Sequence, residues 1–469
     1  MRRQYGNRGD DEAPRTTSTV GDSPGTVAHP PHKSAFTTLS AAQLTGSFDV
    51  TTALNPSLSS PPTLRNPYRW MVLFLCWFAF TMTSVDRSAW GPSSVFVGES
   101  LAVPLASLGI FATAYYIGYV VSNAGGGFLT DKIGGRHLIT ISMIGAGAFM
   151  IVFGSTTSAV VGIAVQGVVG FFAGADYAAG IKLLSSWFRP EELGKVMGIF
   201  TSATSLGVVI ANFAVPFLIS HFGWGASYHL FGAISIVSGI VCHLILRPGP
   251  VVAVAADRAG SPKRPSAWRI LSSNRNLLLV GLAGFGGFWG TYGFVIWSNA
   301  LMIKGHGVAP ATAGVIVALF AALGVFGKPI IGLVADRFNG ARRVPSMIVL
   351  GGFAVMLVVF GMLDSVPAFL IAAPLLGLSA YCYLPLIVAL IPRLVSSEMV
   401  GTAAGLTNAL WQVGSVLVPI AVGAVFTATH NSFIAALGTL AVGPLIGMVA
   451  MYFVNERPDE VKVIVKAEA

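Results

Sequence analysis

Twelve apolar runs follow one another along this chain, and each is long enough to cross a bilayer as a helix. About 20 residues at roughly 1.5 Å each span the hydrocarbon core of a membrane. We expect membrane helices at residues 69–91, 106–129, 138–155, 159–186, 195–219, 228–246, 277–302, 312–335, 344–363, 367–391, 401–427 and 433–454. Because 54% of the residues are hydrophobic and only 10% are charged, a water-soluble globular protein is excluded. The sequence therefore predicts an all-α membrane protein.

The longest polar connection, Arg247 to Arg275, lies between the sixth and seventh runs and divides the helices into two groups of six. The first 66 residues are rich in Ser, Thr, Pro, Gly and Asp without apolar periodicity, so we expect a disordered tail that is either regulatory or a plain extension. The predicted parts are a cytoplasmic tail at 1–66, six-helix bundles at 67–247 and 276–455, a basic cytoplasmic linker at 248–275 and a second cytoplasmic tail at 456–469.

Basic residues are distributed unequally between the two sides of these helices. A net charge of +9 raises the question of nucleic-acid binding, but most Lys and Arg fall in loops of one face. They are Lys132, Arg136, Arg189, Lys195, Arg337, Arg342, Arg343 and Arg393, whereas Lys304 falls on the other face. The positive-inside rule places the basic face and both termini in the cytoplasm. We therefore expect a multi-pass protein of the cell membrane without a nucleic-acid partner.

Two landmarks occur twice in the chain. A Gly- and Asp-containing loop follows the second run and again the eighth, with Asp131 and Asp336 separated by 205 residues. Glu191 and Glu398, each followed by Gly-x-x-x-Gly, are separated by 207 residues. The spacing indicates a duplicated six-helix unit of the kind found in secondary transporters. Each loop is expected to latch one conformation, through Gly127, Asp131, Lys132, Arg136, Asp336 and Arg337.

The first apolar run, Trp70 to Trp90, ends in an adjacent acid and base, Asp86-Arg87. A charge at the middle of a membrane costs about 2.5 to 3.5 kcal/mol on insertion scales, so such residues usually face protein or an aqueous path. The functional interpretation is a binding site within the helix bundle. The alternative is a helix that ends near Ser84, with the pair at the far membrane interface.

Polar side chains in other runs supply further candidates. Tyr115, Tyr119 and Asn123 recur every four residues and form one polar stripe, in which Tyr119 is either a ligand contact or core. Gly118, Ser122 and Gly126 form an adjacent small-residue stripe that suits a close helix contact. An opposite wall is expected from Tyr292, Trp297 and Tyr381, with Asn408 either binding a ligand or bridging helices. Lys328, about 12 Å before Asp336 by helical rise, is interpreted as support for the loop latch.

The chain resembles the major facilitator superfamily over nearly all of residues 67 to 455, and within that superfamily it is most similar to the anion:cation symporter family. The motifs that carry the resemblance are Asp86-Arg87, Gly109, Gly118-Tyr119, the loop from Gly127 to Arg136, Ser186-Trp187-Phe188, Gly223-Trp224 and Trp297. The resemblance implies two six-helix bundles with inverted 3+3 repeats, and uptake of a small organic anion such as a sugar acid driven by a proton gradient. Some relatives use sodium or exchange instead.

The chain departs from that family at three positions. Ala173 stands where members often carry Glu, Thr204 where they usually carry Gln, and Gly225 where Arg is common. Asp176 lies three residues beyond Ala173 on the same helix face, so it is expected to replace the missing carboxylate. The Gly-Pro pattern of drug-proton antiporters is absent from the fifth run, which argues against multidrug efflux.

The sequence thus predicts a proton-coupled symporter of a small organic anion. Arg87 binds the carboxylate, because a guanidinium offers a fork that matches its two oxygens. Asp86 carries the coupling proton, and Asp176 is a second proton site or a conformational lock; Thr204 joins the substrate contacts. Without a metal-ligand cluster, Walker loop or nucleophile elbow, we expect no cofactor and no enzyme, and a monomer in the bilayer. The rivals are an exchanger or uniporter, in which Asp86 merely neutralises Arg87, and a non-transporting membrane sensor.

Overall fold

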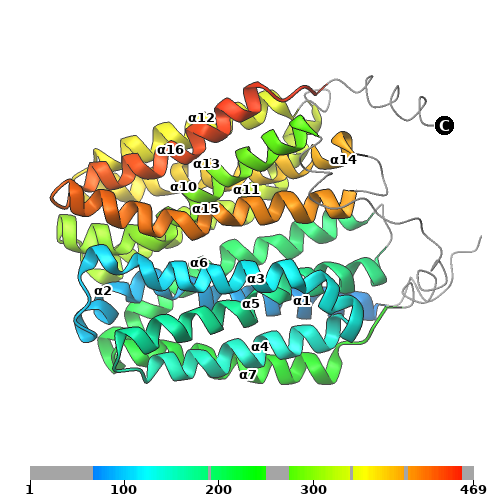
Figure 1. Ribbon diagram of the computed structural model, residues 1–469, viewed down its shortest axis with the longest axis horizontal. Coiled ribbons are helices and arrows are strands. Elements are labelled where there is room, and N and C mark those ends of the chain that lie inside the picture. Colours follow the sequence, from blue (N-terminus) through cyan, green and yellow to red (C-terminus); the bar gives the residue numbers. More distant parts are fainter. Residues whose placement is uncertain (1–66, 189–191, 250–273, 338–341, 396–399, 457–469) are drawn as a thin grey trace, which may run out of the picture. The chain divides into compact units, whose positions relative to one another are not determined.

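The computed structural model describes residues 67–188, 192–249, 274–337, 342–395 and 400–456, which are almost entirely helical (Figure 1). The elements are α1 (Tyr68–Ser88), α2 (Trp90–Ser100), the 3-10 turn η2 (Leu105–Ser107), α3 (Gly109–Ile133), α4 (Gly135–Gly154), α5 (Ala159–Trp187), α6 (Leu193–Phe222), α7 (Trp224–Ile245), α10 (Arg275–His306), α11 (Pro310–Arg337), α12 (Arg343–Gly361), α13 (Val366–Val388), α14 (Ile391–Leu394), α15 (Val400–Ala428) and α16 (Phe433–Tyr452). Twelve helical segments in this part of the chain are long and apolar enough to cross a membrane, which confirms the expected all-α membrane class.

The first span is longer than expected, because it runs from Tyr68 to Ser100. Ala89, the residue between α1 and α2, keeps helical backbone angles of φ −62° and ψ −25°. The helix therefore does not end near Ser84, and Asp86 and Arg87 lie inside the span rather than at its far end. The interpretation of the pair as an interfacial feature is wrong.

The helices pack as two bundles, α1 to α7 and α10 to α16, with corresponding neighbours in each. In the first bundle α3 packs on α5 and α4 on α7; in the second, α11 packs on α13 and α12 on α16. These pairs occupy the same places in the order of membrane spans, as a duplicated unit requires. Residues 1–66 and 457–469 and most of the linker at 248–275 lie outside the described residues, so the expectations for them stay predictions.

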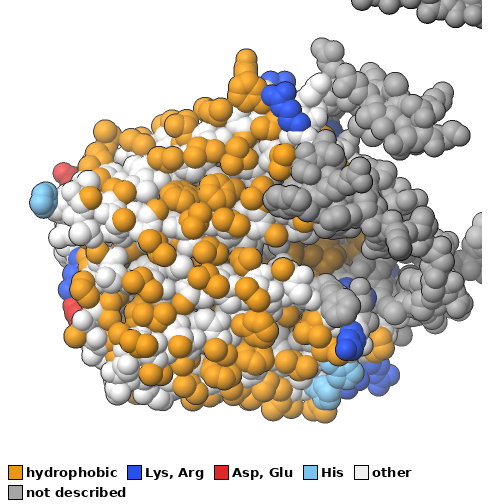
Figure 2. Space-filling view, in the orientation of Figure 1, with side chains coloured by type: hydrophobic (Ala, Val, Ile, Leu, Met, Phe, Trp, Pro, Cys, Tyr) orange, Lys and Arg blue, Asp and Glu red, His pale blue; other side chains and the backbone are white. Residues whose placement is uncertain are grey.

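Charge and hydrophobicity separate on the surface of the helices. Figure 2 shows hydrophobic side chains across their flank and Lys and Arg mainly beside one end. We call this the basic end; it carries the start of α1 and the end of α16, with Lys132, Arg247, Arg275, Arg342 and Arg343. Of the described Lys and Arg residues, Lys304 at the end of α10 lies at the opposite end. An apolar flank with charged ends is the distribution that a bilayer imposes.

Helices α3 and α5 approach each other closely where small residues meet. A carbon added at Gly118 would lie 2.0 Å from the carbonyl oxygen of Gly167. Further along, the same face of α3 places Ser122 against Gly174 and Gly126 against Ala175. The small-residue stripe predicted from the sequence thus forms a close contact between α3 and α5.

Gly118→Ala should destabilise the protein, because the added methyl group collides with backbone that cannot rotate away. Overpacking of this kind costs about 1–3 kcal/mol. Gly125→Ala is the matched control on the same helix, since an added carbon there meets no atom within 4 Å. Thermal unfolding of both purified variants should show a lower apparent melting temperature for Gly118→Ala alone. Equal melting temperatures would contradict the described contact between α3 and α5.

Candidate functional site

The two bundles meet along α3 with α15, α6 with α11 and α2 with α10. Hydrogen bonds and one ion pair cross this interface between its middle and the opposite end. They join Asn299 Nδ2 to Asn212 Oδ1 (2.9 Å), Thr113 Oγ1 to the carbonyl of Val416 (3.0 Å) and Lys304 Nζ to Glu99 Oε1 (2.5 Å). Nearer the basic end, the hydrogen bonds from Asn408 Nδ2 to Asn123 Oδ1 (3.4 Å) and from Lys328 Nζ to the carbonyl of Thr201 (3.3 Å) also cross between the bundles. The bundles are thus joined at several levels of the interface.

Arg87 lies in the middle of this interface, enclosed by aromatic rings from both bundles. Its side chain extends from α1, and its guanidinium carbon lies 5.8 Å from the ring centre of Tyr119 on α3 and 5.0 Å from that of Tyr292 on α10. Nη2 donates a hydrogen bond to Ser84 Oγ at 3.3 Å. Arg87 is only 9% exposed and forms no ion pair with any residue that the structure describes. The ring faces stabilise the cation without neutralising it.

Asp86 and Asp176 lie inside the first bundle instead. Asp86 accepts hydrogen bonds from Ser235 Oγ on α7, at 3.0 and 3.2 Å. Asp176 Oδ2 on α5 accepts one from Thr83 Oγ1 at 2.9 Å, and its Oδ1 has no partner among the described residues. Consecutive residues of a helix point about 100° apart, so Asp86 turns toward α7 while Arg87 turns toward the second bundle. The acid therefore does not pair with the neighbouring base.

A second cation, Lys328 of α11, enters the interface from the other bundle. Its Nζ donates to Thr204 Oγ1 at 2.8 Å and to the carbonyl of Thr201 at 3.3 Å, both on α6. It also lies 4.8 Å from the ring centre of Tyr381 on α13 and is 5% exposed. The sequence predicted that Lys328 supports the loop latch, whereas its ammonium group lies against Thr204, Thr201 and Tyr381. The helical rise of about 12 Å between Asp336 and Lys328 indicated that Lys328 lies well inside the membrane. Helical rise does not say in which direction a side chain points.

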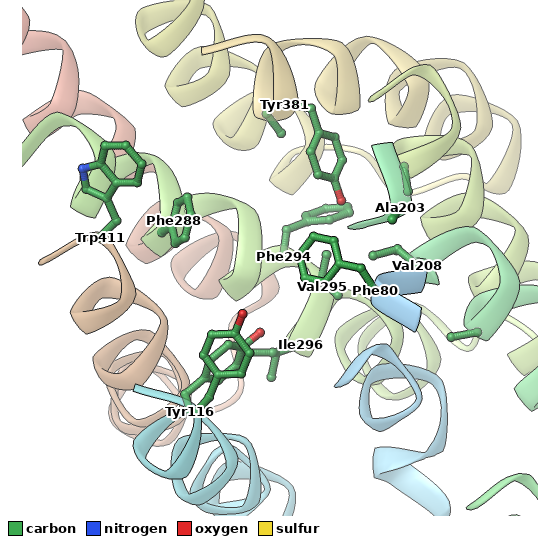
Figure 3. Packing of buried hydrophobic residues seen from close by; sticks show 14 of the residues in the cluster. Phe80, Tyr116, Ala203, Val208, Phe288, Phe294, Val295, Ile296, Tyr381 and Trp411 are labelled. Atoms are coloured by element: carbon green, nitrogen blue, oxygen red, sulfur yellow. The ribbon is translucent and has the colours of Figure 1, made fainter. Parts of the chain in front are cut away.

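Five of the residues expected at the site are thus gathered here: Arg87, Tyr119, Thr204, Tyr292 and Tyr381. Sequence reasoning missed Tyr116, which is buried with its ring centre 5.6 Å from that of Tyr292. Figure 3 shows Tyr116 and Tyr381 reaching inward from opposite bundles, with Phe294, Val295 and Ile296 of α10 between them. Tyr116 of α3 thereby packs against the second bundle.

Trp297 and Asn408 occupy different places. Trp297 Nε1 donates to the carbonyl of Pro419 at 3.2 Å and its ring lies beside Gly109, within the contact at the opposite end. Asn408 Nδ2 donates to Asn123 Oδ1 at 3.4 Å, so it bridges α15 and α3. Its neighbourhood still offers free polar groups, because Asn123 Nδ2 and Gln412 Oε1 have no partners among the described residues.

The expected latch residues lie at the basic end, where the structure describes them only in part. Lys132 is exposed and Arg136 is half-buried. The surroundings of four latch residues are not among those that the structure describes: Gly127, Asp131, Asp336 and Arg337. Their proposed role in holding one conformation stays a prediction.

The chain matches the family model described as Major Facilitator Superfamily over residues 76–419 and 294–468. It is 22% identical over 429 residues to a probable galactarate/D-glucarate transporter, GudP, of Bacillus subtilis (strain 168), covering 82% of this chain and 92% of that protein. It is 23% identical over 302 residues to the membrane sensor protein UhpC of Salmonella typhimurium, covering 61% of this chain and 68% of the sensor.

A solved structure has the same fold. The bacterial homologue of the human lysosomal transporter Spinster, in an inward-facing and occupied conformation, superposes with a TM-score of 0.67 at 15% identity, covering 83% of this chain and 96% of that one. The family match spans both bundles and agrees with the twelve spans and the duplicated packing. The expected family is confirmed: this chain is a multi-pass membrane protein that belongs to the Major Facilitator Superfamily, a family of transporters and not of enzymes.

Proposed function

We propose that this protein carries a small organic anion, such as a sugar acid, across the cell membrane by proton-coupled symport. The observation that carries the proposal is Arg87, a buried cation between the bundles with no described carboxylate partner. A guanidinium has five N–H donors, and Ser84 is the one hydrogen-bond acceptor described for Arg87. Donors therefore remain for a ligand carboxylate. The relative named as a probable galactarate/D-glucarate transporter supports an acid of this kind.

Alternating access follows from where Arg87 lies. An anion on its guanidinium would touch Tyr119 of one bundle and Tyr292 of the other, so rocking of the bundles would open the site first to one side and then to the other. The positive-inside rule orients the basic end and both termini toward the cytoplasm. In that orientation the ion pair between Lys304 and Glu99 lies at the outer end. The paired Asp loops at positions 131 and 336 lie toward the cytoplasm, where we expect them to hold one conformation.

Coupling to protons is assigned to Asp86 and Asp176. Both carboxyl groups are buried in the first bundle, where they accept hydrogen bonds from Ser235 and Thr83. A proton can therefore bind there without competing for Arg87. Asp86 is adjacent to Arg87 in the chain, so an anion that neutralises Arg87 favours a proton on Asp86. Binding of the two would thereby be linked.

Transport assays in proteoliposomes test the proposal against its rivals. Counterflow of a radiolabelled sugar acid is expected from a symporter, an exchanger or a uniporter, and its absence would favour a sensor, the role of the UhpC relative. An imposed pH gradient should drive accumulation only in a proton symporter. Replacing Na⁺ by K⁺ in the same assay shows whether sodium serves instead.

Arg87→Lys should weaken anion binding by about tenfold or more, because it keeps the charge but loses the fork, and a charge-assisted hydrogen bond contributes roughly 1.5–3 kcal/mol. Arg275→Lys is the matched control, since Arg275 is exposed at the basic end. Titration of purified protein with the transported acid measures both dissociation constants. If Arg87→Lys and Arg275→Lys bind equally well, Arg87 does not hold the anion.

Asp86→Asn should retain counterflow and lose accumulation driven by a pH gradient, because Asn mimics the protonated carboxyl group and cannot release a proton. The two assays are run side by side on one preparation of proteoliposomes. Asp364→Asn, a change in an exposed loop, should leave both unchanged. Accumulation that survives in Asp86→Asn would assign the proton elsewhere, with Asp176 the next carboxylate to replace.

A further inference from the structure

We propose that Lys328 is a second anion-binding residue, and that the substrate is a dianion whose two acid groups bridge Arg87 and Lys328. This rests on the proposed function and deepens it by naming the class of anion. The sequence placed Lys328 near the loop latch, and no residue of the resemblance corresponds to it. Its assignment therefore comes from the contacts that the folded chain makes.

The two cations are linked through a short path of side chains. Arg87 Nη2 donates to Ser84 Oγ at 3.3 Å, and Ser84 Oγ donates to the carbonyl of Thr204 at 2.8 Å. Lys328 Nζ completes the path by donating to Thr204 Oγ1 at 2.8 Å. Along this path Ser84 and Thr204 lie between the two cations, and a ligand with an acid group at each end would bridge that span.

No described carboxylate compensates these charges. The ion pairs among described residues are Arg69–Glu192, Lys304–Glu99 and Arg393–Glu456, and none includes Arg87 or Lys328. The two acids nearest in sequence to the site are turned into the first bundle by Ser235 and Thr83. Two buried cations without counter-charge are costly, since a buried charge is stable only when it is paired. A monoanion would neutralise one of them, and a dianion would neutralise both.

Further hydroxyl groups of the described residues are candidates for binding the rest of such a ligand. Thr204 is half-buried and accepts from Lys328, while Ser205 Oγ and Tyr115 Oη are buried without hydrogen-bond partners among the described residues. An unpaired buried hydroxyl group costs free energy unless a ligand or water satisfies it. These donors suit hydroxyl or carboxyl oxygens of a compact polar chain.

The arrangement also gives the substrate a mechanical role. Arg87 belongs to the first bundle and Lys328 to the second. Like charges repel, so a dianion between the two cations would add an attraction to each of them. Substrate binding would then draw α1 and α11 together in the middle of the membrane, which is the movement that occlusion needs.

The test compares acids that differ in one terminal group. Galactarate and galactonate share a carbon skeleton, but galactonate has a hydroxymethyl group in place of the second carboxylate; succinate and 4-hydroxybutyrate form a shorter pair of the same kind. Wild-type protein should bind the diacid of at least one pair about tenfold or more tightly than its monoacid, the order expected from one charge-assisted hydrogen bond. Lys328→Gln should abolish this ratio by weakening the diacid alone. Lys195→Gln, at an exposed position of α6, should preserve it.

The ratio of diacid to monoacid binding shows whether Lys328 contacts the substrate or only supports the packing of the helices. If Lys328 only holds α11 against α6, Lys328→Gln lowers stability and weakens both acids of a pair equally, which would overturn the inference. Equal binding of both acids by wild-type protein would also overturn it, whether or not the variant folds, and would leave the proposed anion transport intact. Binding of neither acid in either pair, together with no counterflow, would contradict the proposed function itself.

Discussion

A charged side chain inside a bilayer has to be enclosed by protein. Helix α1 carries two such side chains, and they point in different directions. Asp86 turns into the first bundle, where Ser235 hydrogen-bonds both of its oxygens. Arg87, the next residue, turns out of that bundle into the faces of Tyr119 and Tyr292. The division depends on an unbroken helix through Ala89, since an early end would leave both groups at the membrane surface.

Separation of acids from bases is what leaves the interface positively charged. Had Asp86 paired with Arg87, the site would be neutral and would offer an anion little attraction. The hydroxyl groups of Ser235 and Thr83 supply the alternative partners that keep the carboxyl groups inside the first bundle. Hydrogen bonds from neutral groups can hold a buried carboxyl group in place without cancelling the field of a cation nearby.

The two ends of the bundle interface are built from different chemistry. At the opposite end the backbones touch: a carbon added at Gly109 would lie 2.3 Å from the carbonyl oxygen of Pro419, and Asn212 and Asn299 hydrogen-bond across α6 and α10. Further toward the basic end, longer side chains make the contacts, with Lys328 against the ring of Tyr381 and the hydroxyl group of Thr204. Close contacts between small residues are short-range and act only when the helices touch, whereas charges act at a distance. The two kinds of contact along this interface therefore differ in their range.

The sequence by itself determined the membrane class, the number of spans, the duplication and the family. Bilayer thickness sets the length of each apolar run, and the repeated motifs and their spacing can be read directly from the order of residues. It also identified Arg87, Tyr119, Thr204, Tyr292 and Tyr381, which the fold gathers into one cluster. Only the tertiary structure decided the partners within it. It separated Asp86 from Arg87, brought Lys328 to Thr204 and set Trp297 against Pro419. Helical periodicity gives the spacing of residues along one helix, but the rotation of each helix against its neighbours depends on packing between segments that are far apart in the chain.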